Sequence, residues 1–171
     1  HPWTEKSKLS ILQRGKLIET SAYASTLNIS VTIADRELEV LNNQFDLSTR
    51  KSLNFKGISQ GNTAFVVVNF EHHQQVFSTL GEMKKSAEKV AQDLAKDVKT
   101  YLKTDTVADE YLTDQLLLPL ALGQGGEFTA QVLSKHTKTQ AEMIQKFLDC
   151  EISFKEVDNI FQVNVRVSHL T

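Results

Sequence analysis

A histidine just ahead of an expected helix is the first candidate for chemistry. His136 lies shortly before Thr139, which we expect to cap a helix because Glu142 follows it in capping-box spacing. A helix start offers unpaired N–H groups and partial positive charge, which suits phosphate and disfavours a protonated imidazole. A neutral imidazole can attack phosphorus, and Lys135 and Lys138 flank it to neutralise phosphate oxygens. The pattern indicates nucleophilic chemistry on a phosphate; the ordinary alternative is an exposed or capping histidine.

A second candidate is a polar face on the apolar stretch upstream of His136. Tyr111, Asp114 and Gln115 stand at helical positions i, i+3 and i+4, so they share one face. Pro119 has no N–H, so the carbonyl of Gln115 loses its helical partner. An aromatic ring, a carboxylate, a carboxamide and a free carbonyl could hold an adenine and a ribose. The alternative is an ordinary amphipathic helix with a polar edge.

Three other features predict no site. His72 and His73 are adjacent, so on a strand they would point to opposite faces, and a polar hairpin turn is the better interpretation. Cys150 has no CxxC partner and is expected to be a small apolar residue at a helix end. The glycine run 123–126 lacks the GK[ST] sequel of a Walker loop and predicts a turn. No metal ligands can be named from the sequence.

Periodicity predicts alternating helices and strands, and hence an α/β (α+β) fold. Residues 9–25 are expected to be extended, and 46–62 to be polar and turn-rich. The expected helices are 34–45, 86–103 with Ser86 as N-cap, 107–118, and one that begins at Thr139. The expected strands are 63–70 and 74–80, which form a hairpin, then 127–132, 152–157 and 161–167. A boundary is predicted at Leu80–Gly81, which gives a front block (9–80) and a back block (81–171).

Several of these segments resemble the C-terminal half of RNA 3'-terminal phosphate cyclases. The resembling residues are the run YLTDQ at 111–115, GGEF at 125–128, and His136 in HTKT, with further similar pieces in QRG at 13–15 and LGEMKKSAE at 80–88. The resemblance implies that 9–80 is a small inserted α/β domain. It also implies that 81–171 is the C-terminal catalytic α/β unit, the last of several repeats.

The resemblance implies an activity as well. Family members convert an RNA 3'-phosphate to a 2',3'-cyclic phosphate with ATP. His136 would form a histidine–AMP intermediate, and a divalent metal, expected to be Mg²⁺, would accompany the triphosphate. The nucleotide contacts would be Tyr111, Leu112, Thr113, Asp114 and Gln115. At Gln140, close to the expected helix start, the sequence departs from the family pattern.

Composition limits the choice of function. The chain has 171 residues, a net charge of −2 and a pI near 6.2, so no global basic surface is present and an RNA site must be local. One cysteine excludes an internal disulfide and fits a reducing cytoplasm. No apolar run is long enough to span a bilayer.

Two alternatives stay open beside the cyclase interpretation. The chain starts at His1 without a signal-peptide pattern, which predicts a fragment that lacks an N-terminal half. It could therefore be a truncated, inactive remnant. It could also be a non-catalytic, cyclase-like RNA-binding or ribosome-assembly protein. Such relatives lack the nucleophilic histidine, so the presence of His136 argues against the second alternative.

Overall fold

The computed structural model describes residues 7–168 and divides into two units. The central unit comprises Gly15–Lys103, and the terminal unit combines residues up to Arg14 with those from Thr104 onwards. The predicted absence of a signal peptide concerns the first residues of the chain, most of which lie outside the described range. Each unit contains one four-stranded sheet and two helices, and each is described by itself.

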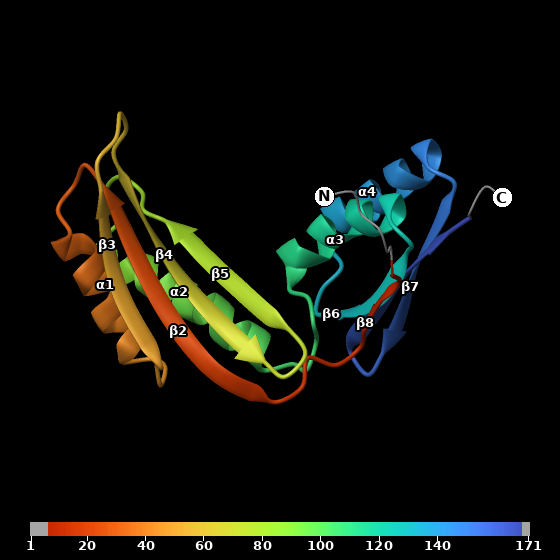
Figure 1. The fold of residues 1–171 in the computed structure, drawn as a ribbon, viewed down its shortest axis with the longest axis horizontal. Coiled ribbons are helices and arrows are strands. Elements are labelled where there is room, and N and C mark those ends of the chain that lie inside the picture. Colours follow the sequence, from red (N-terminus) through yellow and green to blue (C-terminus); the bar gives the residue numbers. More distant parts are fainter. Residues whose placement is uncertain (1–6, 169–171) are drawn as a thin grey trace. The chain divides into compact units, whose positions relative to one another are not determined.

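The central unit is a sheet with both of its helices on one face (Figure 1). Its strand order is β3-β2-β4-β5, where β2 and β3 are parallel and the other neighbours are antiparallel. The strands are β2 (Leu17–Leu27), β3 (Thr49–Phe55), β4 (Gly61–Phe70) and β5 (Gln74–Leu80), and the helices are α1 (Thr32–Asn42) and α2 (Ala87–Leu102). The predicted hairpin of β4 and β5 is confirmed.

Helix α2 belongs to this central unit, so the predicted boundary at Leu80–Gly81 differs from the observed one at Lys103–Thr104. Ser86 caps α2 as predicted, and its Oγ accepts from the Lys89 N–H. The apolar stripe of α2 includes Leu94 and Val98, which pack in the same core as the helix-facing residues of the sheet. The sheet therefore needs α2 to cover its inner face, and the chain leaves the unit only after that helix.

Two sequence expectations for the central unit need correction. The stretch 46–62 contains strand β3, although its side chains are mostly polar and exposed. Because β3 is an edge strand joined to β2 by backbone hydrogen bonds, it needs no apolar alternation. The extended stretch 9–25 is two strands in different units, separated at Gly15, where the backbone adopts a φ of 79°.

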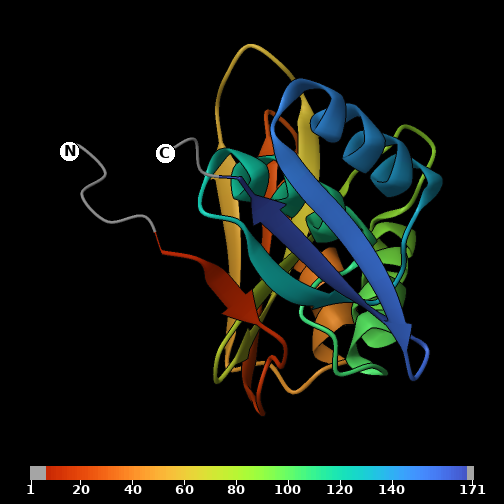
Figure 2. The ribbon, with the colours of Figure 1, turned by 90° about the vertical axis from the view of Figure 1, so that its right-hand side faces the viewer.

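The terminal unit has strand order β1-β6-β8-β7, with β7 and β8 as an antiparallel hairpin (Figure 2). Its elements are β1 (Leu9–Ile11), α3 (Glu110–Leu122), β6 (Gly126–Ala130), α4 (Lys135–Phe147), β7 (Cys150–Val157) and β8 (Ile160–Val167). Cys150 thus begins a strand and does not end a helix. The core packs Leu117 of α3 and Ala141 of α4 against Phe128, Val163 and Val165 of the sheet.

The fold class is confirmed: both units are mixed α and β, with two sheets and four helices among residues 7–168. Over the same residues, no helix combines the length and apolar character needed to cross a bilayer. His72 and His73 lie in the turn between β4 and β5, as predicted, and the Phe70 N–H donates to the His73 carbonyl at 2.8 Å.

Candidate active site

Helix α3 begins later than predicted, because Asp109 caps it. The Asp109 carboxylate accepts from the Leu112 N–H at 2.7 Å, and the Thr113 hydroxyl donates back to the Asp109 carbonyl at 2.6 Å. Val107 and Ala108 therefore precede the helix, and Ala108 forms a bridge with a residue of β6. The helix runs on past Pro119 to Leu122, beyond the predicted end at 118.

Helix α4 begins at Lys135 and not at Thr139. Ser134 is the N-cap: its Oγ accepts from the Thr137 N–H at 3.0 Å and lies 2.9 Å from the Thr137 hydroxyl. The predicted capping box at Thr139 is therefore wrong, because an earlier serine already satisfies the first free donors. His136 stands in the first turn of α4, closer to the positive end of the helix than the sequence indicated.

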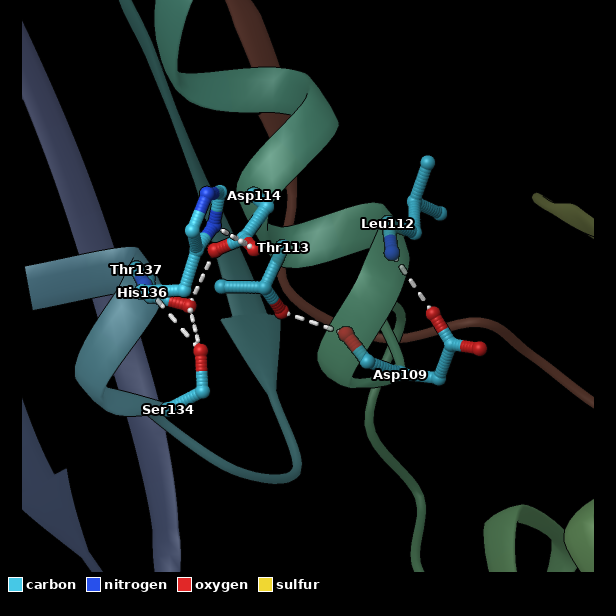
Figure 3. A network of polar contacts seen from close by, with 7 residues as sticks. All are labelled: Asp109, Leu112, Thr113, Asp114, Ser134, His136 and Thr137. Carbon is cyan, nitrogen blue, oxygen red and sulfur yellow. Dashed lines mark hydrogen bonds and ion pairs between the residues drawn. The ribbon is translucent and has the colours of Figure 1, made fainter. Parts of the chain in front are cut away.

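A carboxylate from α3 holds this helix start, as Figure 3 shows. Asp114 Oδ2 lies 2.5 Å from His136 Nδ1. The Thr137 hydroxyl donates to the other oxygen, Oδ1, of the same carboxylate. His136 and Thr137 of α4, which are 22 and 23 positions from Asp114 of α3 in the sequence, thus form one polar cluster with it.

The contact with Asp114 selects the tautomer of the His136 imidazole ring. An ionised carboxylate only accepts hydrogen bonds, so Nδ1 of His136 carries the proton that it donates. In the neutral ring the lone pair then lies on Nε2. The His136 side chain is 76% exposed while that of Asp114 is 19% exposed, so the ring is held from one side and open on the other. This arrangement can present a nucleophilic nitrogen to a substrate.

Apart from the Asp114 carboxylate, the electrostatic surroundings of His136 favour an anion. The first turn of α4 contains no acidic residue, so no carboxylate of that turn offsets the helix terminus. The N–H groups of Lys135 and His136 have no intrahelical acceptor, as at any helix start. Lys135 and Lys138 are exposed on the same turn. Phosphate oxygens are the natural ligand of such a helix start.

The other predicted nucleotide-binding residues occupy different environments on α3. Thr113 is fully buried and bonds to its own helix, and Leu112 packs against the apolar core. Tyr111 is 72% exposed, and Gln115 is exposed too. Of the five, Asp114 is the one placed in contact with His136; nucleotide binding by all five stays a prediction.

Sequence reasoning missed Ser134 and Thr137. Both were visible as a hydroxyl pair with N-cap spacing in the run SKHT, but the capping-box pattern at Thr139 outweighed them. Among the described residues, no group of three or more His, Cys, Asp or Glu side chains is arranged to hold a metal ion. The glycine run 123–126 forms the turn between α3 and β6, as predicted, with Gly126 starting the strand.

Comparison with known proteins agrees with the sequence resemblance. The sequence model of the RNA 3'-terminal phosphate cyclase family matches residues 8–154. The RNA 3'-terminal phosphate cyclase of Koribacter versatilis (strain Ellin345) is 36% identical over 165 residues, which cover 95% of this chain and 46% of that protein. The chain thus spans about half the length of the relative that it matches. With the family match extending over most of the sequence, the chain belongs to the RNA 3'-terminal phosphate cyclase family.

Proposed function

We propose that this chain supplies the nucleophile of an ATP-dependent RNA 3'-terminal phosphate cyclase. His136 Nε2 attacks the α-phosphorus of ATP, a P–N bond forms, and pyrophosphate leaves. The RNA 3'-phosphate takes the AMP group from the histidine. The neighbouring 2'-hydroxyl then attacks the 3'-phosphorus, loses its proton and expels AMP, which leaves the 2',3'-cyclic phosphate. The reaction is a ligase-type nucleotidyl transfer.

The observation that carries this proposal is the contact between Asp114 and His136. It accounts for the tautomer that a histidine nucleophile needs, because the proton on Nδ1 is held by the carboxylate. The Thr137 hydroxyl holds the second carboxylate oxygen, so the pair has a defined geometry. A non-catalytic RNA-binding or ribosome-assembly protein would not need a histidine presented in this way.

Other residues of the chain would bind ATP and orient it. The start of α4, with Lys135 and Lys138, fits the phosphates. Tyr111 and Gln115, exposed on α3, fit an adenine ring and its polar edge. The magnesium expected from the resemblance would arrive on the triphosphate, and we assign it no ligands on this chain. Binding of RNA, and a cytoplasmic location, belong to the same proposal.

The experiment uses a full-length protein that contains this chain, incubated with ATP labelled at the α-phosphate. The wild-type protein should acquire a label that is acid-labile and base-stable, as expected of a phosphoramidate. His136→Ala and His136→Asn should abolish it. His72→Ala, an exposed histidine in the hairpin turn, is the matched control and should label fully. The 171-residue chain alone should label weakly or not at all.

The proposal also predicts the nature of the RNA product. A 3'-phosphorylated oligonucleotide should become resistant to phosphatase with the wild-type protein and not with His136→Ala. A label that survives in His136→Ala would place the nucleophile elsewhere and overturn this assignment.

A further inference from the structure

The sheet of the central unit has one face that α1 and α2 cover and one that neither helix of the unit covers (Figure 1). On the covered face, side chains such as Ala22, Ala24, Ala64 and Val66 are completely buried. The alternate residues are half-buried from Tyr23 to Leu27 in β2 and from Thr63 to Asn69 in β4, in a two-residue period. We call this second surface the open face.

Two aromatic side chains occupy the centre of the open face. Tyr23 of β2 and Phe65 of β4 are directly opposite each other across the two central strands. Opposite Cβ atoms in an antiparallel pair are about 5 Å apart, so the two rings are neighbours. Lys51 pairs with Tyr23 on one side, and Ser78 pairs with Phe65 on the other. The row of four residues spans about 14 Å across the sheet.

Hydroxyl groups surround this aromatic pair. Four positions flank the pair along its own two strands on the open face. Ser21, Ser25 and Thr63 occupy three of them, and Val67 occupies the fourth. The Ser21 hydroxyl is buried against that of Ser48, and the Thr63 hydroxyl donates to the Thr79 carbonyl, so the half-buried Ser25 is the hydroxyl that can face a ligand. The centre of the face thus combines two flat π surfaces with a polar group, which suits a ligand that has flat faces and polar edges.

The two rings at the centre of the face favour a ligand with flat aromatic surfaces. The strongly exposed apolar side chains of the sheet lie on the edge strands (Phe55 of β3, 52% exposed; Val76 and Leu80 of β5, 50% and 72%) and at the start of β2 (Leu17 and Ile18, 51% and 65%). Nucleobases stack on aromatic side chains and accept hydrogen bonds at their edges.

Charge on the open face favours an anionic backbone near the aromatic pair. Lys51 is exposed in the same row as Tyr23. Glu19 is an acidic residue of this face, and its carboxylate accepts from the Asn69 amide at 2.8 Å. It lies four residues along the strand from Tyr23, a distance of about 13 Å. A phosphate beside the aromatic pair would therefore meet a lysine and be far from the carboxylate.

We infer that the open face binds single-stranded RNA, with two successive bases stacked on Tyr23 and Phe65 and a phosphate near Lys51. This inference rests on the proposed function, in which RNA is the substrate. It assigns that RNA a second contact with the chain, separate from the contact at His136. Stacking contributes about 1–3 kcal/mol per base, so loss of both rings should weaken binding at least tenfold.

The test measures binding of a fluorescein-labelled ten-nucleotide RNA to the 171-residue chain by fluorescence anisotropy. The RNA ends in a 3'-hydroxyl and no ATP is added, so the reaction cannot proceed. Tyr23→Leu with Phe65→Leu keeps apolar area and removes both π faces; affinity should fall at least tenfold. The matched control, Tyr23→Phe with Phe65→Tyr, keeps both rings and should bind within about twofold of wild type.

Crosslinking keeps the inference testable if the leucine variant does not fold. RNA that carries 4-thiouridine should crosslink to wild-type peptides that contain Tyr23 or Phe65. Equal RNA affinity of the leucine variant and wild type, or crosslinks confined to the terminal unit, would overturn the inference. A change in the association state of the chain without a change in RNA affinity would mean that the face binds protein. Failure of the ATP labelling described above would instead count against the proposed function.

Discussion

At the scale of single residues, the carboxylate of Asp114 divides its two oxygens between two tasks. One oxygen accepts from His136 Nδ1 and so selects the ring tautomer, while the other accepts from the Thr137 hydroxyl. Thr137 is fully buried and also receives the cap from Ser134. The orientation of the imidazole is therefore tied to the start of α4 and does not depend on the exposed ring finding its own position.

Replacement of Asp114 by asparagine keeps the size and shape of the side chain and removes its negative charge. An amide can fill the same space, but its NH₂ group competes for the place opposite Nδ1 and would select the wrong tautomer. A hydrogen bond to a charged partner contributes about 1.5–3 kcal/mol, so the single-turnover rate of α-phosphate labelling should fall at least about tenfold. Asp93→Asn, on the exposed side of α2, is the control. A wild-type rate for Asp114→Asn would show that this carboxylate does not set the tautomer.

Glu37 is a second unusual residue, in the core of the central unit. Its side chain on α1 is completely buried, and the Asn62 amide donates to one carboxylate oxygen while the other has no partner. Burial raises the pKa of Glu37 from 4.5 to about 7, and the hydrogen bond from Asn62 partly opposes that rise. The folded chain therefore holds a proton that the unfolded chain releases.

The raised pKa predicts how stability depends on pH. Between pH 4.5 and 7 the folded state binds more protons than the unfolded state, so the free energy of unfolding falls as pH rises through this window. Glu37→Gln, neutral at every pH, should lose this slope. Measured by urea unfolding, the free energy of unfolding of this variant should rise relative to that of wild type by on the order of 2 kcal/mol from pH 4.5 to pH 8. Glu39→Gln, at an exposed position on the same helix, is the control and should show no such gain in free energy of unfolding. An equal dependence of the free energy of unfolding on pH in Glu37→Gln and wild type would contradict the assignment.

At the scale of elements, N-cap side chains fix where the helices near the site begin. Ser134 and Asp109 cap the two helices that contribute to the cluster, and Ser86 caps α2 in the other unit. In each case a side-chain oxygen accepts from an N–H three residues on. The caps have the same geometry, but only the cap of α4 lies next to a candidate nucleophile.

Ser134→Ala and Ser86→Ala form a matched pair that tests this difference. Each removes one N-cap and should lower the free energy of unfolding by about 1 kcal/mol. Only Ser134→Ala should also slow α-phosphate labelling in the full-length protein, because Thr137 loses its contacts with the Ser134 hydroxyl and the His136–Asp114 geometry loosens. Urea unfolding and labelling rates check both parts. Equal labelling by the two variants would mean that the cap acts on stability alone.

At the scale of the whole molecule, α1 and α2 together cover one face of the sheet of the central unit. Arg36 of α1 donates two hydrogen bonds, of 2.7 and 2.8 Å, to the Glu88 carboxylate of α2. These bonds lower the pKa of Glu88 to about 2. In the last turn of α2, Tyr101 packs in the core against the rings of Phe70 and Phe77.

Fragments should fold according to these contacts. Residues 15–103 contain every element of the central unit and should show one cooperative urea transition, followed by far-UV circular dichroism. Residues 15–80 are the part of the expected front block (9–80) that belongs to this unit, and they lack α2. The inner face of the sheet then loses Leu94, Val98 and Tyr101, so this fragment should not fold cooperatively. Cooperative folding of 15–80 would restore the boundary at Leu80–Gly81.

The sequence by itself determined the elements whose signal is local. The apolar stripe of α2 and the cap at Ser86 follow helical spacing, and the β4–β5 hairpin follows two apolar runs on either side of a short polar turn. The family, too, was readable from the sequence, because motifs such as YLTDQ and HTKT keep their order and spacing. His136 and Asp114 were candidates on these grounds, each on its own segment.

Only the tertiary structure decided which segments meet. It placed the two halves of one extended stretch in separate sheets, and it made the polar segment Thr49–Phe55 a strand because β2 lies beside it. In the tertiary structure Ser134, and not Thr139, caps α4. The helix then begins where the Thr137 hydroxyl also donates to the Asp114 carboxylate of α3. Hydrogen bonds between residues far apart in the chain, and the burial of one helix by another, leave no periodic pattern in the local sequence. The pairing of His136 with Asp114 is of this kind, since it exists only after α3 and α4 have packed on the same sheet.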